Sequence, residues 1–76
     1  MNNARRKQLE LAEQHIDTAC DLVKSALDEE QFSLDNVPES MQDSDRYYKM
    51  EDAIDCLSFA LDSLTDAKED IGEARA

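Results

Sequence analysis

One histidine and two cysteines are the side chains of this sequence that most readily bind a metal. His15, Cys20 and Cys56 together would suit zinc, which prefers imidazole and thiolate ligands. However, His15 and Cys20 are five residues apart and do not share a helix face. The residue three before His15 is Ala12, where a di-iron helix site requires glutamate. We therefore expect no metal site and no cofactor, but two half-buried thiols that pack as small apolar groups.

Carboxylates are the other chemically capable group, with 19 acidic residues in the chain. Acid-base catalysis needs a carboxyl in a desolvated cleft, whereas the pattern described below places these acids on outer helix faces. A chain with one His and one Gly has no Ser/His/Asp set and no glycine-rich phosphate loop. Asp43-Ser44-Asp45 begins like a calcium loop, but Tyr48 stands where that loop needs glycine. We expect no catalytic residue and a protein that is not an enzyme.

Six of these acids recur along the C-terminal half and would form an acidic ribbon: Asp52, Asp55, Asp62, Asp66, Glu69 and Glu73. The simple interpretation is a solvated face that keeps the protein soluble. The sharper one is nucleic-acid mimicry, because helical carboxylates three, four or seven residues apart are separated by about 4.5, 6 or 10.5 Å along the axis. These steps bracket the repeat of a phosphate backbone. The net charge of −11 repels nucleic acid and acidic membranes and attracts basic protein surfaces.

Phe59 is a large apolar residue within the acidic ribbon. Such a residue either meets another protein or is a tolerated exposed side chain. Because aromatic residues are enriched at interfaces, we expect Phe59 to anchor the partner that contacts the ribbon.

The ribbon needs a helix to carry it, and residues 47 to 74 have the required periodicity. With Met50 at heptad position a, every a and d site is apolar: Met50, Ala53, Leu57, Ala60, Leu64, Ala67, Ile71 and Ala74. This spacing predicts the seam of a packed helix pair. A first helix over about residues 5–30 has a matching set of a and d residues: Leu9, Ala12, Ile16, Ala19, Val23 and Ala26.

Residues 31–43 are the predicted connection, because Pro38 cannot lie inside a helix. Asp43 or Ser44 would cap a second helix over about residues 44–74. The fold class is therefore all-α, a single antiparallel helical hairpin of the coiled-coil type over residues 1–76. Four apolar residues of the connection are expected to fold over the end of the hairpin: Phe32, Leu34, Val37 and Met41.

The pairing of the two helices can be predicted from the length of the connection. Residues at equal height should have numbers that add up to roughly 75. That register would set the basic cluster Arg5, Arg6 and Lys7 beside the acids at the end of the second helix, Glu69, Asp70 and Glu73.

Two helices bury only one facing stripe, so we expect a homodimer that forms a four-helix bundle. Additional apolar residues beside the two stripes are the expected oligomer interface: Leu22, Leu27, Ile54 and Leu61.

The run Leu34 to Gln42, continued by Ser44, Arg46-Tyr47, Met50-Glu51 and Ala53-Ile54-Asp55, resembles a pattern found in small acidic two-helix proteins of phages and mobile elements of Gram-positive bacteria. The resemblance covers about residues 20 to 74. It implies a mobile-genome context, in which small acidic proteins are often inhibitors of host defence enzymes. It implies no particular activity.

These observations lead to two hypotheses. The first is a non-enzymatic binding protein, in its sharpest form a phage inhibitor that mimics DNA and occupies the nucleic-acid channel of a basic host-defence protein. The alternative is a structural oligomer or scaffold subunit without mimicry. We expect no signal peptide, and the two cysteines are expected to be reduced. The sequence has no apolar run of the roughly 18 residues that span a membrane. We therefore expect a cytoplasmic protein, in the host bacterium if phage-encoded.

Overall fold

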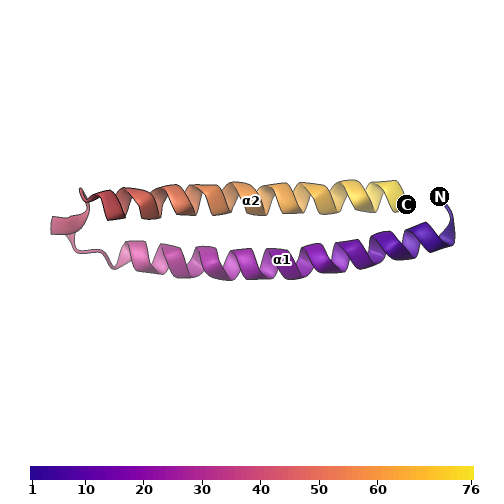
Figure 1. Ribbon diagram of the computed structural model, residues 1–76, viewed down its shortest axis with the longest axis horizontal. Coiled ribbons are helices and arrows are strands. Elements are labelled where there is room, and N and C mark those ends of the chain that lie inside the picture. The colour runs from indigo at the N-terminus through magenta and orange to yellow at the C-terminus, as the bar shows by residue number, and fades with distance from the viewer.

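The computed structural model describes residues 1–76 as two long antiparallel helices joined at one end. Helix α1 (Asn3–Asp35) and helix α2 (Asp45–Arg75) lie side by side along their length, with the short 3-10 helix η1 (Glu39–Met41) at the tip (Figure 1). The backbone extends over 59 × 14 × 13 Å. The prediction of an all-α helical hairpin is confirmed.

Helix α1 is longer than predicted, because residues 31–35 continue it. Asn2 caps its start through a 2.8 Å hydrogen bond, in which the backbone N–H of Arg5 donates to Asn2 Oδ1. At the other end, Gln31 Nε2 donates to Asp35 Oδ1 at 2.9 Å, and Asn36 Nδ2 donates to the carbonyl of Phe32 at 2.7 Å. The carbonyl of Phe32 also accepts from the backbone N–H of Asn36 at 3.2 Å, so it is bonded twice by Asn36 at the end of the helix.

Helix α2 begins after Ser44, which was one of the two predicted capping residues. Ser44 Oγ accepts a hydrogen bond from the backbone N–H of Tyr47 at 3.2 Å. Asp45 lies in the first turn, where a carboxylate is favourable to the helix dipole.

The connection does not fold over the end of the hairpin as a group. Leu34 and Val37 are half-buried, but Phe32 is 71% exposed and Met41 is 53% exposed. The expected plug was wrong for Phe32 because this residue belongs to α1 and lies on its outer surface.

The seam between the helices differs from the predicted a/d seam. In α2 the half-buried residues recur at alternating spacings of four and three: Met50, Ile54, Leu57, Leu61, Leu64, Lys68, Ile71 and Arg75. Of the alanines that were placed in the seam, Ala53 is half-buried beside it, and Ala60, Ala67 and Ala74 are exposed. Ile54 and Leu61, each one residue after a predicted d site, therefore take the facing positions. A leucine or isoleucine gains more from facing the other helix, because it buries far more apolar area than an alanine.

Helix α1 follows the same rule. Its alternating half-buried residues are Leu9, Glu13, Ile16, Cys20, Val23, Leu27, Glu30 and Leu34. Ala12 and Ala19 are half-buried beside this seam, and Ala26 is exposed. The prediction of the apolar a residues was correct, and that of the alanines as equal partners was wrong.

Ion pairs near the open end of the hairpin show its register. Lys68 pairs with Asp17 and Arg75 with Glu10, and in each case the residue numbers add up to 85, while those of the Arg75–Glu13 pair add up to 88. The predicted value of about 75 was wrong, and the five residues of the expected connection that belong to α1 account for about half of the difference. Because Arg75 pairs with Glu10 and Glu13, Arg5, Arg6 and Lys7 lie beyond the last turn of α2 at this register, and they form no ion pair with Glu69, Asp70 or Glu73.

No residue of the hairpin is buried. Every seam residue keeps part of its surface open, since one helix can cover only one side of the other. The fold therefore has a facing stripe but no enclosed core.

Candidate functional site

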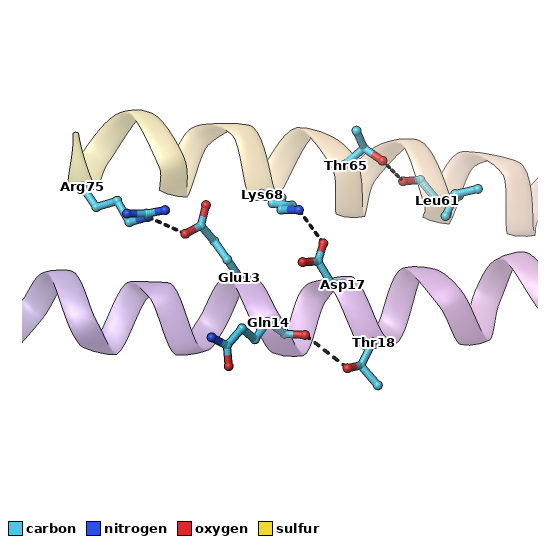
Figure 2. A network of polar contacts seen from close by, with 8 residues as sticks. All are labelled: Glu13, Gln14, Asp17, Thr18, Leu61, Thr65, Lys68 and Arg75. Carbon is cyan, nitrogen blue, oxygen red and sulfur yellow. Dashed lines mark hydrogen bonds and ion pairs between the residues drawn. The ribbon is translucent and has the colours of Figure 1, made fainter.

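Ion pairs cross from α2 to α1 on one side of the hairpin (Figure 2). Lys68 Nζ lies 2.5 Å from Asp17 Oδ1, and Arg75 Nε pairs with Glu13 Oε2. The hydrogen bond to Asp17 raises the pKa of Lys68 above its ordinary value of 10.5. Gly72 lies between the two basic residues, and a Cβ added there would be 3.3 Å from Glu13 Oε1. These contacts define the polar side of the hairpin.

Further from the seam, the polar side of α1 carries a line of carboxylates. Asp21 follows Asp17 by four residues, so it lies one turn further along the same side. Asp28 and Asp35 repeat its position at seven-residue steps of about 10.5 Å. We call Asp21, Asp28 and Asp35, all exposed, the second acidic row.

The acidic ribbon of α2 borders the same polar side. Glu69 precedes Gly72 by three residues, and Asp62 and Asp55 repeat its position at seven-residue steps. At the observed register Asp62 lies at nearly the height of Asp21, and Asp55 at nearly the height of Asp28. The hairpin thus carries two antiparallel lines of carboxylates, one on each helix, with matched steps.

All seven residues predicted to bind a partner are exposed on α2: Asp52, Asp55, Phe59, Asp62, Asp66, Glu69 and Glu73. They form two neighbouring lines, since Asp52, Phe59, Asp66 and Glu73 are also seven residues apart. Phe59 is 71% exposed within the second line, which points away from α1. The acidic ribbon is therefore a continuous exposed surface along α2.

The second acidic row was missed at the sequence level. Its members were not singled out there, although their seven-residue repeat could have identified them. What the sequence did not provide was the side of the hairpin on which they lie, because that depends on which residues form the seam.

The four predicted oligomer residues lie in two different places. Leu27, Ile54 and Leu61 are half-buried seam residues, because each lies one residue after a predicted d site, on the side of the helix where the seam is found. Leu22 is 68% exposed and lies outside the seam.

The potential metal ligands are not brought together. Cys20 and Cys56 are both free thiols. Cys20 is half-buried as predicted, but Cys56 is exposed, so the prediction of two half-buried thiols was wrong for Cys56. The predicted register of about 75 would have set them at nearly equal height, but the observed register places Cys20 near the height of Leu64 and Cys56 near that of Asp28. No group of three or more His, Cys, Asp or Glu side chains has the arrangement of a metal site.

A cavity of about 260 Å³ opens at the tip of the hairpin. It is lined by residues of all three elements and the connection, among them Val37, Met41, Arg46 and Tyr47. Neither helix has a stretch long and apolar enough to pass through a lipid bilayer.

No known protein family matches this chain, and comparisons with curated proteins and with solved structures also find no match. The fold and its surfaces are therefore the basis for the function proposed below.

Proposed function

We propose that this protein is a non-enzymatic acidic binding module whose partner is a basic protein surface. The observation that carries the proposal is the pair of matched carboxylate lines along the polar side, one on each helix. In its sharpest form the module is a nucleic-acid mimic from a phage or mobile element that inhibits a host-defence protein in the cytoplasm.

Two features of the hairpin support mimicry. A phosphate duplex presents two antiparallel lines of negative charge, and the acidic ribbon and second acidic row offer the same arrangement on a straight rod. A rod of 59 × 14 × 13 Å is also slender enough to enter a long basic groove. A basic groove that neutralises phosphates would be attracted to such a rod by the same long-range field.

The experiment is a competition assay with a basic partner captured from a bacterial lysate. The wild-type protein should displace DNA from that partner, and Asp21→Lys combined with Asp62→Lys should not. The matched control is Glu39→Lys combined with Asp43→Lys, which makes the same charge change at the tip, where both residues are exposed. If both double variants displace DNA as well as the wild type, the mimic proposal is wrong.

Phe59 has a separate role in this proposal. It would fill an apolar pocket between the basic residues of the partner, which adds contact area that nucleic acid lacks. Phe59→Ala should weaken capture at high salt more than at low salt, because salt screens the carboxylates but not the apolar contact.

The second candidate is a structural oligomer or scaffold subunit in which the acids serve only solubility. The observation that favours it is the complete lack of buried residues, which is unusual for a protein that acts alone. If this second candidate is correct, both double charge-reversal variants should capture partners as well as the wild type does.

A further inference from the structure

One strip of α1 that faces away from α2, beside the second acidic row, carries little charge. Leu11, Leu22 and Phe32 lie on it and are 53%, 68% and 71% exposed. Between Leu11 and Phe32, the other residues of this strip are Thr18, Ser25, His15 and Glu29, and Asp21 and Asp28 of the second acidic row border it. In a chain with 36% charged residues, a strip with so little charge is a clear exception. We call it the free stripe of α1.

The surface area of the hairpin indicates that the free stripe is covered by protein. The hairpin exposes 5809 Å². A compact protein of 8.6 kDa exposes about 4,700 Å², so this hairpin exposes about 1,100 Å² more than its mass predicts. A standard protein interface buries about 800 Å² on each partner. One interface per chain would therefore remove most of the excess.

The spacing along the free stripe indicates what covers it. Leu11 and Phe32 lie eleven residues before and ten residues after Leu22, which is about 16 and 15 Å along the helix. A two-fold axis at Leu22 would therefore set Leu22 against its own equivalent and Leu11 near Phe32 of the second copy. A self-complementary patch of this kind is what a two-fold dimer requires.

The two ionisable residues of the stripe obey the same symmetry. His15 lies seven residues before Leu22 and Glu29 seven residues after it. Antiparallel pairing of two α1 helices therefore places each His15 beside Glu29 of the second copy. Parallel pairing would place Glu29 beside Glu29, where two carboxylates repel each other.

We propose that a second copy of this chain covers the free stripe, with α1 packed antiparallel on α1 across a two-fold axis at Leu22. Both α2 helices then lie on the outside of a four-helix bundle. The acidic ribbon of α2 remains exposed and the second acidic row borders the interface, so the two chains of charge −11 approach each other through the strip of α1 that carries the fewest charges. This inference does not depend on the proposed function. Of the four residues predicted for the oligomer interface, this dimer uses Leu22. The other three, Leu27, Ile54 and Leu61, stay in the seam of each hairpin.

The first test measures mass by sedimentation over a range of protein concentrations. The wild type should sediment at twice 8.6 kDa. His15→Glu should weaken the dimer at least tenfold, since it sets a carboxylate beside Glu29, and adding Glu29→Lys should restore dimerisation. Ser63→Glu is the control, because it adds a negative charge at an exposed residue of α2, which lies on the outside of the proposed bundle. A monomeric wild type, or a double variant no better than His15→Glu, would overturn the proposal.

The second test is a symmetric cross-link and does not require a dissociating variant to fold. With Cys20 and Cys56 replaced by alanine, Leu22→Cys should form a disulfide-linked dimer on oxidation. Phe32→Cys should not, because its two copies would be about 30 Å apart along the paired helices. Cross-linking at both positions would indicate a parallel dimer, and cross-linking at neither would indicate another occupant of the stripe. Either result contradicts the proposal.

Discussion

Lys68 is a charged residue in the seam, and its protonation is linked to folding. The hydrogen bond to Asp17 raises the pKa of Lys68 in the folded protein. A raised pKa means that the protonated lysine stabilises the fold fully below the unfolded value of 10.5, and that this contribution is lost as the pH rises through the folded value. As the pH rises through the folded pKa of Lys68, the wild type should therefore lose stability relative to Lys68→Gln. Near neutral pH the difference in unfolding free energy between the two proteins should not change with pH.

Thermal unfolding followed by circular dichroism over this pH range measures the difference. Asp17→Asn is the control, because it removes the partner that raises the pKa. If Asp17→Asn and the wild type show the same loss of stability at alkaline pH, the contact with Lys68 is not its cause.

The pair of Glu13 and Arg75 is the least exposed ion pair of the hairpin. The Glu13 side chain is 12% exposed and the Arg75 side chain 35%. Arg75→Gln leaves a mostly covered carboxylate without its partner, which should cost about 1 to 2 kcal/mol of unfolding free energy. Adding Glu13→Gln should recover part of this loss. Urea unfolding of the two variants tests the prediction, and equal stability of the single and double variants would contradict it.

At the level of the helix, Ser44 is the residue that sets where α2 begins. Its side chain satisfies a backbone N–H that has no partner within the helix. Ser44→Ala should therefore cost about 1 kcal/mol. Thr65→Ala is the control, since Thr65 is exposed and its hydroxyl only donates to the Leu61 carbonyl within the helix, which is already bonded in the backbone ladder. That control should be neutral or slightly stabilising in the same urea measurement.

The helices show what the sequence could and could not predict. Two amphipathic segments separated by Pro38 were sufficient for the hairpin, because hydrophobic periodicity and proline act locally. The seam was displaced because alanine is a weak marker of burial: Ala60 fits an a/d seam by spacing, but Leu61 has more to gain from facing the other helix. The register could not be predicted because α1 continues to Asp35, and the sequence pattern did not show where this helix ends before Pro38.

The candidate site was predictable in part for the same reason. The acidic ribbon lies on a single helix, so its continuity follows from spacing alone. The second acidic row becomes part of the same surface only when α1 and α2 are placed side by side. That relation depends on tertiary packing, which the periodicity of one helix does not encode.

For the molecule as a whole, the net charge of −11 predicts that salt stabilises the fold. Repulsion among the carboxylates acts over the whole rod, whereas the ion pairs are few and partly exposed. Raising sodium chloride from about 0.01 M to about 0.5 M shortens the screening length from about 30 Å to below 8 Å, so the melting temperature should rise. Asp62→Asn combined with Asp66→Asn should show a smaller rise. A falling melting temperature would mean that the ion pairs contribute more than the repulsion.

The melting temperature should also depend on protein concentration if the hairpin is stable only as a dimer. Unfolding then separates two chains, so each tenfold increase in concentration adds about 1.4 kcal/mol of stability. With an unfolding entropy typical of 76-residue chains, this raises the melting temperature of the dimer by about 4 °C. The Leu22→Cys dimer provides the control, because its covalent link makes unfolding unimolecular and its melting temperature independent of concentration. If the wild type also melts at one temperature at all concentrations, the single hairpin is stable alone, and its free stripe is an exposed surface of the monomer.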